Sequence, residues 1–447
     1  MATTNNHNFS KGTDLAVILV YIMMVAIGVL CIFMIEYNPN LNWSNSFLTA
    51  KTNFSKQIYF SIFCTFIAIF ILLLDSKVFT ALANLSYVGG ILLMLATFVL
   101  GKNINGSKSW IPIAGGFNLQ PAELCKIFTA LFLAKYISKP DTDFKKLKSH
   151  LIAGAAIALP AILSIMQHEM GLALVYSSFI FAMYREGLPP LILVVLLSFA
   201  ILVITTLLLE PTLLAIILTV IAGLFIFSMI KKFKRNKNKI LLVLGIWVVC
   251  FGTVRFAVPY IFNHVFECYQ STRIYSMVGK EYDCSQNKKS TSSTGERRSK
   301  KPDDYNVKQS KIAIGSGGFW GRGFLKGTQT RGKYVPAQHT DFIFTSLGEA
   351  FGFVGTFIFL GLYLFFLFRL VRIAERQRSA FSRVYAYSVV GIFFFHIAVN
   401  ISMTIGLFPV VGIPLPLISY GGSSLLTFTA LLFILLRLDA DRQMVLR

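Results

Sequence analysis

The sequence has few charged residues for its length. Only 14% of its 447 residues are Asp, Glu, Lys or Arg, whereas hydrophobic residues make up 55%. A soluble domain of this size needs roughly a quarter of its residues charged to cover its surface. Acidic residues are the scarcest, 20 against 42 basic ones, which gives a formal net charge of +22. The shortage of charge excludes a soluble globular fold.

Cysteine is also rare. Four of the six cysteines lie in apolar runs, where they suit the role of small packing residues: Cys31, Cys64, Cys125 and Cys250. The other two, Cys268 and Cys284, lie in a polar segment where a disulfide could form, although the sequence does not fix their geometry. No small-residue cleavage site follows the first apolar run, which is too long for a signal-peptide core. We therefore predict that this run is a membrane helix.

Long apolar runs dominate the chain instead. They are about twenty residues long, the length that crosses a hydrocarbon core of about 30 Å as a helix. Phe and Leu fill them without polar alternation, which favours helices over barrel strands. We predict an all-α polytopic transmembrane bundle of about twelve spans, at 14–36, 57–75, 79–100, 119–137, 150–167, 170–184, 189–209, 211–230, 240–263, 342–368, 385–407 and 422–438.

Basic loops give the orientation. Lys and Arg cluster in three short loops, 135–149, 231–239 and 369–383. All three lie inside if the N-terminus is cytoplasmic, as the positive-inside bias requires. Both termini are then cytoplasmic. The net charge therefore reports topology, with some attraction to anionic lipid, and does not indicate nucleic-acid binding.

The order of spans and loops predicts three parts. An N-terminal transmembrane region of about nine spans covers 1–263, a long extracytoplasmic loop covers 264–341, and a C-terminal region of about three spans covers 342–447. Within the loop, 284–304 has almost no apolar residue, which is typical of a hydrophilic insert without a core.

The loop then becomes rich in glycine, from Gln309 to Gly323. Glycine lets the backbone approach a ligand closely and offers free N–H groups to anions. Basic side chains lie among and after these glycines: Lys311, Arg322, Lys326, Arg331 and Lys333. This combination favours a phosphate-bearing substrate. A turn-rich plug without any ligand is an equally good interpretation of the composition.

Two further polar clusters interrupt the apolar runs. Glu123 and Lys126 lie three residues apart near a helix start, so they could pair. Ionisable residues at membrane depth usually face an interior cavity, although a pair at the interface is the alternative. The stretch 406–424 contains three prolines and the run Ser-Tyr-Gly-Gly-Ser. Such broken backbone is tolerated between spans only if it is buried in protein or lines a cavity.

These three clusters, in this order, resemble the motifs of the SEDS family, the RodA and FtsW type of peptidoglycan glycosyltransferase. The residues that match lie across nearly the whole chain: Gly106, Lys108, Trp110, Ile111, Gln120, Pro121, Glu123, Lys126, Gln309 to Gly318, His339 to Phe344, Asn400, Gly406, Pro409, Gly412, Pro414, Pro416 and Ser419 to Gly422. The continuous run from Gln309 to Gly318, followed by Gly-Thr-Gln-Thr, favours the RodA elongation type over the division-type paralogue.

The resemblance implies an enzyme that links lipid II, a polyprenyl-pyrophosphoryl disaccharide-peptide, into glycan strands in cell-wall elongation and shape maintenance. The acceptor hydroxyl attacks the donor's anomeric carbon and polyprenyl pyrophosphate leaves, which requires a base and cations. The family's carboxylate lies ten residues after an Arg; Arg273 plus ten is Asp283, and Asp304 is the alternative if the insert shifts the match. The implied substrate-binding residues are Arg273, Lys311, Arg322, Glu123, Lys126, Lys108, Trp110, Gln309 and Ser310.

The resemblance leaves other roles open. His339 and Asp341, before the tenth span, suit a structural cap as well as catalysis. A divalent cation (Mg or Mn) bridging the pyrophosphate is chemically reasonable, but the sequence has no dedicated ligand cluster and no certain cofactor. The family's usual partner is a class B penicillin-binding protein, a single-span transpeptidase.

The chain departs from the family pattern at several places. Ser109 stands where an Arg is usual before Trp110, and Glu169 stands where an Asp is usual. Two spans more than the usual ten fall within 189–263. A lipid II flippase or transporter is the first rival function, although no span has Asp or Glu at its centre, as coupled transporters need. The second rival is a non-catalytic scaffold for a partner synthase.

Overall fold

The computed structural model describes residues 14–38, 50–104, 107–112, 118–144, 146–209, 211–232, 237–262, 271 and 303–442. Contacts divide the chain into two compact units, residues 1–188 with 306–447 and residues 189–305. These two units are defined by contacts between residues. The three predicted parts are defined by the side of the membrane on which the segments lie, and they stay a prediction.

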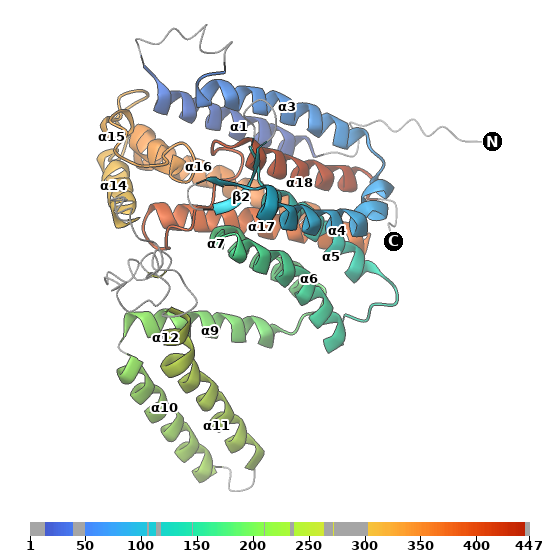
Figure 1. The fold of residues 1–447 in the computed structure, drawn as a ribbon, viewed down its shortest axis with the longest axis vertical. Coiled ribbons are helices and arrows are strands. Elements are labelled where there is room, and N and C mark those ends of the chain that lie inside the picture. Colours follow the sequence, from blue (N-terminus) through green and yellow to red (C-terminus); the bar gives the residue numbers. More distant parts are fainter. Residues whose placement is uncertain are drawn as a thin grey trace, which may run out of the picture. The chain divides into compact units, whose positions relative to one another are not determined.

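Most of the described residues of the first unit are helical (Figure 1). Its elements are α1 (Leu15–Glu36), α3 (Asn53–Leu73), α4 (Ser76–Leu100), β1 (Lys102–Ile104), β2 (Ser107–Pro112), β3 (Asn118–Leu119), α5 (Pro121–Ser138), α6 (Leu147–Met166), α7 (Met170–Tyr176), η3 (Ser177–Phe179), α8 (Ile180–Arg185), α14 (Asp303–Ser316), α15 (Thr328–Arg331), α16 (Ile343–Glu375), α17 (Ala380–Thr404) and α18 (Gly422–Ala440).

Local sequence explains where these helices begin. The side chains of Asp14, Thr52 and Asp75 accept hydrogen bonds from the first-turn N–H groups of α1, α3 and α4, as side chains at N-cap positions do. Helix α5 begins at Pro121, whose fixed φ suits the first helical position. The long apolar stretches that follow contain no polar alternation, so helix is the structure that satisfies their backbone in lipid.

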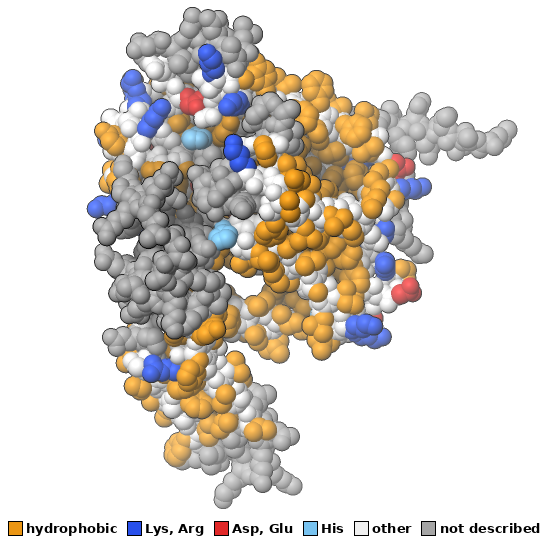
Figure 2. Space-filling view, in the orientation of Figure 1, with side chains coloured by type: hydrophobic (Ala, Val, Ile, Leu, Met, Phe, Trp, Pro, Cys, Tyr) orange, Lys and Arg blue, Asp and Glu red, His pale blue; other side chains and the backbone are white. Residues whose placement is uncertain are grey.

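Helices α5, α17 and α18 form the centre of the first unit. Helix α17 packs against α5, α16 and α18, and α18 also packs against α3 and α5. Most side chains of α17 and α18 are buried, whereas the outer helices expose many apolar ones, such as Leu85, Leu92 and Ile162. Figure 2 shows hydrophobic side chains over the face that α4 and α6 form, with charged side chains toward the two ends. This distribution is that of a membrane protein.

The second unit contains α9 (Pro190–Leu208), α10 (Pro211–Lys232), α11 (Lys237–Gly252), the π-helical turn η4 (Thr253–Ala257) and α12 (Val258–Tyr260). Helices α10 and α11 form an antiparallel pair joined by a short connection (Figure 1). Trp247 donates its indole N–H to Thr219 Oγ1 at 3.3 Å, which links this pair. The pair lies in the region where two spans beyond the usual ten were predicted.

All twelve predicted segments are helical in the structure. Among the described residues, eight helices are long and apolar enough to cross a membrane. The other four predicted segments correspond to α5, which carries three charged residues, and to the shorter apolar helices Met170–Arg185, Pro190–Phe199 and Thr212–Phe227. The chain is therefore a multi-pass helical membrane protein, as the sequence predicts.

Two predicted boundaries were wrong. Helix α16 continues to Glu375, beyond the predicted end at 368, because its last turns carry arginines that form ion pairs with neighbouring helices. Residues 303–316, predicted as part of an irregular loop, form helix α14. Two aspartates at its start favour the helix through the macrodipole, and its glycine comes only near its end.

Candidate functional site

A charged pair is buried at the centre of the first unit. Lys126 Nζ lies 2.6 Å from Glu123 Oε2 on α5, and both side chains are almost completely buried. Lys126 Nζ also lies 2.9 Å from His396 Nε2 on α17. The ammonium group faces the ring of Phe428 on α18, 5.3 Å from its centroid. The predicted pairing of Glu123 with Lys126 is confirmed, and the pair lies in the interior rather than at the interface.

The proline-rich stretch 405–421 lies next to this cluster and is held by side chains. Asn400 Nδ2 donates to Asp341 O at 2.8 Å and to Ile413 O at 2.7 Å. Ser419 Oγ donates to Thr340 O at 2.7 Å. Residues 415–419 of this stretch are buried in protein and are tied to the residues that precede α16, whereas Leu407 is exposed.

Residues 102–104, 107–112 and 118–119, which precede α5, form a small three-stranded sheet. Strands β1 and β2 pair antiparallel with Lys102 opposite Trp110, and β2 pairs with β3. The Ser109 hydroxyl donates to Glu169 Oε1 at 2.7 Å, which joins β2 to the break between α6 and α7. Gln120 N donates to Ser423 Oγ at 3.1 Å, which joins the start of α5 to that of α18. The polar segment that precedes α5 and the polar segment 406–424 therefore lie in contact.

Helix α16 is broken at Gly352, and the glycine-rich loop fills the break. Gly352 has φ +61°, a left-handed conformation inside the helix. Four backbone hydrogen bonds join the break to residues 318–323: Phe353 N to Gly318 O (2.9 Å), Val354 N to Phe319 O (3.1 Å), Arg322 N to Glu349 O (3.0 Å) and Gly323 N to Ala350 O (2.9 Å). Since backbone groups at membrane depth must be satisfied by protein, the loop completes the helix.

The glycines of this loop are required by that contact. A Cβ added at Gly317 or Gly321 would lie 2.2 Å from a carbonyl oxygen of α16. The N–H groups of Gly317, Gly318, Gly321 and Gly323 all donate to backbone carbonyls. They are therefore not the free anion-binding N–H groups that the composition indicated. These four N–H groups therefore do not supply a phosphate contact in this structure.

Glu349 anchors the rest of the loop. Its carboxylate, completely buried in the first half of α16, accepts hydrogen bonds from Gln329 N (2.8 Å), Thr330 N (2.8 Å) and Thr330 Oγ1 (2.6 Å). Gly327 lies against this carboxylate, where a Cβ would come within 2.7 Å of Oε2. The sequence analysis missed Glu349, although an acidic residue inside an apolar run was a usable signal.

Several predicted binding residues have structural partners. Ser310 is completely buried and bonds Thr345 Oγ1 at 2.6 Å and Thr404 O at 2.8 Å, so it ties α14 to α16 and α17. Lys311 lies over Gly406, where an added Cβ would be 2.5 Å from Nζ. Ser310 therefore fastens α14 to the bundle, whereas Lys311 packs on Gly406 and remains exposed.

Arg322 braces the loop while remaining exposed. It donates from Nε to Ser316 O at 3.1 Å and from Nη1 to Thr328 Oγ1 at 3.0 Å. Gln309 and Trp110 are both half-buried. These three side chains keep the surface access that a substrate contact needs.

Other predicted site residues lie outside the described part of the chain. Arg273 and Asp283 are not among the described residues, and neither are Cys268 and Cys284. Asp304 belongs to α14 and Lys108 to β2, but their side chains are not described. The four cysteines that are described, Cys31, Cys64, Cys125 and Cys250, are free thiols.

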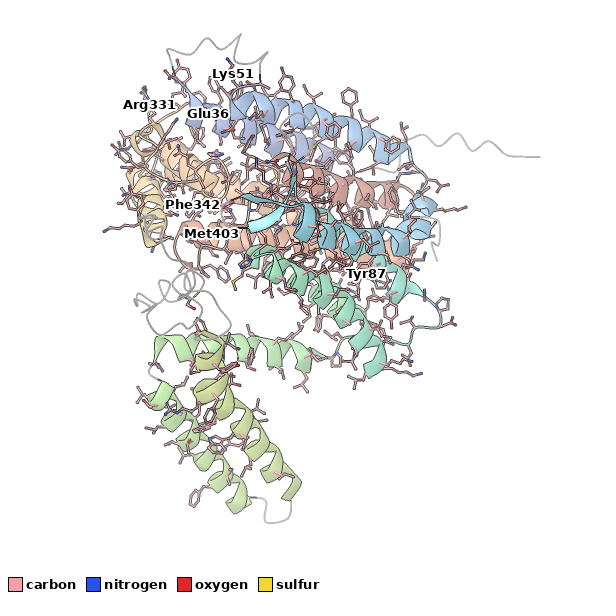
Figure 3. All side chains as sticks on the ribbon, viewed as in Figure 1. Glu36, Lys51, Tyr87, Arg331, Phe342 and Met403 are labelled. Carbon is pink, nitrogen blue, oxygen red and sulfur yellow. The ribbon has the colours of Figure 1, made fainter. Side chains whose placement is uncertain are left out.

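The loops meet at one end of the first unit, where Figure 3 labels Glu36 and Arg331. The His339 and Tyr420 rings are in contact there, with centroids 5.7 Å apart, and Tyr420 N donates to His339 O at 2.9 Å. Burial lowers the pKa of His339; Glu36 opposes this effect and Lys333 adds to it. Burial also raises the pKa of Tyr420 to about 12. Both side chains are therefore neutral near pH 7.

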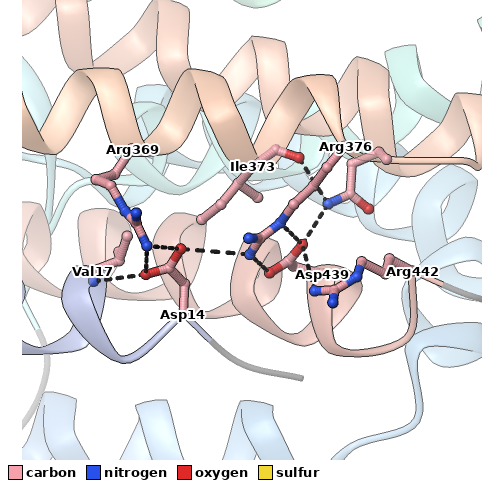
Figure 4. Close-up of polar contacts among 8 residues, drawn as sticks. Asp14, Val17, Arg369, Ile373, Arg376, Asp439 and Arg442 are labelled. Atoms are coloured by element: carbon pink, nitrogen blue, oxygen red, sulfur yellow. Dashed lines mark hydrogen bonds and ion pairs between the residues drawn. The ribbon is translucent and has the colours of Figure 1, made fainter. Parts of the chain in front are cut away.

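Ion pairs close the opposite end of the first unit (Figure 4). Asp14, at the start of α1, accepts two hydrogen bonds from Arg369 Nη2 at 2.7 and 2.6 Å. Asp439, completely buried on α18, pairs with Arg376 and accepts from Gln377 Nε2 at 2.9 Å. These contacts join α1, α16 and α18.

Sequence reasoning also missed His396, and it named Asn400, one turn away on α17, only as a match to the family pattern. Both are completely buried within a span. Polar residues at membrane depth are rare and functional, and their i, i+4 spacing places them on one face. That signal was present in the apolar run. No group of three or more His, Cys, Asp or Glu side chains with metal-binding geometry occurs among the described residues.

Comparison with known proteins agrees with this architecture. The family model of FtsW, RodA and SpoVE, described as cell cycle proteins, matches residues 14–237 and 194–444. The chain therefore belongs to the FtsW/RodA/SpoVE family. The two matched ranges overlap over residues 194–237, which is where the sequence predicts extra spans.

Individual relatives cover most of both chains. The peptidoglycan glycosyltransferase RodA of Treponema pallidum is 31% identical over 437 residues, 93% of this chain and 94% of the relative. The peptidoglycan glycosyltransferase MrdB of Escherichia coli K12 is 30% identical over 369 residues, 83% of this chain and 80% of the relative.

Solved structures share the fold. A chain from a peptidoglycan synthase complex superposes with a TM-score of 0.64 at 22% identity, covering 96% of this chain and 98% of that one. The rod shape determining protein RodA of Thermus thermophilus gives a TM-score of 0.59 at 21% identity, covering 97% and 98%. At these identities the likeness establishes the helical architecture.

Proposed function

We propose that this chain is a peptidoglycan glycosyltransferase of the RodA elongation type, which polymerises lipid II into glycan strands. One observation carries the proposal: a relative named for that activity matches over 93% of this chain and 94% of its own length. The fold supports it, since the three polar clusters of the sequence converge around α5, α16 and α17.

We refer to the end of the first unit that carries β1–β3, α14 and α15 as the loop end. In the proposed reaction, residues of the long predicted loop supply the base and the cations. Asp283 accepts the proton of the acceptor hydroxyl as that oxygen attacks the donor's anomeric carbon, and polyprenyl pyrophosphate leaves. Arg273 and Arg322 compensate the departing charge. The role of Asp283 rests on its place ten residues after Arg273 in the family pattern, with Asp304 as the alternative.

We further propose the setting of this reaction. The loop end faces the extracytoplasmic side of the bacterial cytoplasmic membrane, and both termini lie inside, in keeping with the three basic loops. The partner is a class B penicillin-binding protein. The similarity to a chain from a peptidoglycan synthase complex supports such a pairing.

Purified protein, with its cognate transpeptidase, tests the proposal on lipid II. Glycan strands should form from wild-type protein, and their length should be resolved on gels. The same preparation in vesicles reports lipid II translocation. Translocation without any polymer, with an active partner present, would replace the polymerase with a flippase. Polymer that still forms after both candidate carboxylates, Asp283 and Asp304, are replaced would indicate a contaminating or partner polymerase.

A further inference from the structure

The contact between Lys126 and His396 fixes the chemistry of the histidine. A lysine ammonium can only donate, and Lys126 Nζ lies 2.9 Å from His396 Nε2. Nε2 must therefore accept, which places the imidazole proton on Nδ1. Nδ1 lies 3.2 Å from the carbonyl oxygen of Pro414, a group that can only accept. His396 thus bridges the ammonium group and a backbone carbonyl in a single tautomer.

The bridge joins three elements at one buried point. Lys126 belongs to α5, His396 to α17, and Pro414 to the stretch 405–421. The His396 ring also meets the Phe428 ring of α18 edge-on, with centroids 4.8 Å apart. His396 and Lys126 are both completely buried. The position of the ammonium group is therefore set by Glu123, His396 and Phe428 together.

Pro414 is connected in turn to the loop end. Asn400, one turn from His396 on α17, holds the neighbouring Ile413 carbonyl at 2.7 Å and the Asp341 carbonyl at 2.8 Å. A few residues further on, Ser419 Oγ donates to Thr340 O. These contacts link the segment around Pro414 to residues 340 and 341, which precede α16.

We propose that His396 is a positioning residue of the glycosyltransferase reaction. It holds the Lys126 ammonium and the 405–421 stretch in one arrangement, and both of its ring nitrogens are needed. This inference rests on the proposed function. His396 touches neither reacting sugar nor pyrophosphate in this account, so it acts through the residues that it orients.

Two substitutions separate its two links. His396→Gln places an amide oxygen near the former Nε2, where it can accept from Lys126, and removes the Nδ1 donor. His396→Asn places an amide nitrogen near the former Nδ1, where it can donate to Pro414 O, and removes the acceptor for Lys126. His396→Phe keeps the aromatic packing on Phe428 and removes both links. His150→Gln, at another buried histidine that packs against Phe144, is the matched control.

The measurement is the kcat and KM of glycan polymerisation, with the thermal midpoint of each purified variant. We expect His396→Phe to lower kcat at least tenfold with a midpoint close to that of His150→Gln. We expect His396→Gln and His396→Asn each to recover part of the lost kcat, and neither variant to recover all of it. If the Phe variant fails to fold, the Gln and Asn variants decide the outcome.

Three results would overturn the proposal. These are a kcat of the Phe variant equal to that of wild type, full recovery of activity by one amide variant alone, and losses of kcat that all follow the loss of folded protein. Absence of polymer from the wild type is a separate result, which contradicts the proposed function rather than the role of His396.

Discussion

Ser109 donates a hydrogen bond to Glu169 at 2.7 Å, so two residues that depart from the family pattern lie in contact. The usual residues at these positions, Arg and Asp, have opposite charges. Here a neutral hydroxyl and a longer carboxylate occupy the same two places. The contact indicates that the two departures compensate each other, because the Ser109 hydroxyl donates a hydrogen bond to the carboxylate at 169 in place of the arginine.

The Ser109–Glu169 contact predicts coupling between the two positions. Ser109→Ala removes a donor from a carboxylate, so it should lower the free energy of unfolding by about 1–2 kcal/mol. The same change in a Glu169→Gln background should cost clearly less. The check is a double-mutant cycle on unfolding in detergent. Additive costs would mean that the contact contributes nothing specific.

Restoring the family residue gives a second readout at this site. Ser109→Arg should retain polymerisation while Glu169 is present, because the carboxylate can pair with the guanidinium. In a Glu169→Gln background the same arginine loses that partner, and turnover should fall about tenfold, which corresponds to about 1.4 kcal/mol. Equal turnover in the two backgrounds would contradict the compensation.

Gly352 should be intolerant of any side chain. Its φ of +61° disfavours a Cβ, which would lie 2.3 Å from Gly321 N. Gly352→Ala should lower the free energy of unfolding by about 2–3 kcal/mol or prevent folding. Gly361→Ala, in the same helix and with no atom within 4 Å of the added Cβ, is the control. Similar thermal midpoints for the two variants would show that the break in α16 is not fixed by packing.

The ion pairs opposite the loop end predict unequal effects of two nearby arginines. Arg376→Ala removes the nearer of the two arginines that pair with the buried Asp439 carboxylate and leaves Gln377 and Arg442, at 3.9 Å, which should cost about 3 kcal/mol. Arg378→Ala, at an exposed position two residues away, should change the free energy of unfolding by less than about 0.5 kcal/mol. Thermal unfolding of both variants checks this, and a small effect at Arg376 would mean that Asp439 finds another partner.

His339 gives the structure a pH dependence. Burial lowers its pKa, so the folded chain binds fewer protons than the unfolded chain at acidic pH. Stability should therefore fall as the pH drops below about 6.5, the ordinary histidine value. His339→Gln should remove this part of the pH dependence between about pH 6.5 and pH 5. Parallel stability profiles for wild type and variant would contradict the assignment.

The sequence predicted the helices well because long apolar runs leave the backbone no other structure in lipid. It also predicted the pairing of Glu123 and Lys126, since their spacing alone places them on one helix face. The role of the glycines was harder to predict. Composition cannot distinguish a glycine that admits a ligand from Gly321, which admits the backbone of α16, because the partner is distant in sequence.

The contacts of the polar residues on α17 were missed for a related reason. His396 and Asn400 lie in an apolar run, and their meaning comes from Lys126, Pro414 and Ile413, which belong to other elements. Lys126 lies 270 positions from His396, and a contact over such a separation cannot be read from local pattern. The presence of two polar residues on one face of a span was nevertheless detectable.

The most direct test of the central claim is glycan polymerisation from purified lipid II, with the cognate transpeptidase, by wild type, Asp283→Asn and Asp304→Asn. The account predicts long glycan strands from wild type and Asp304→Asn, and at least a hundredfold lower turnover for Asp283→Asn with lipid II binding retained, in line with loss of a general base. Loss of polymerisation only with Asp304→Asn would assign the base to Asp304, at the other end of the insert, instead of Asp283. Undiminished polymerisation by both variants would contradict a carboxylate base in this loop.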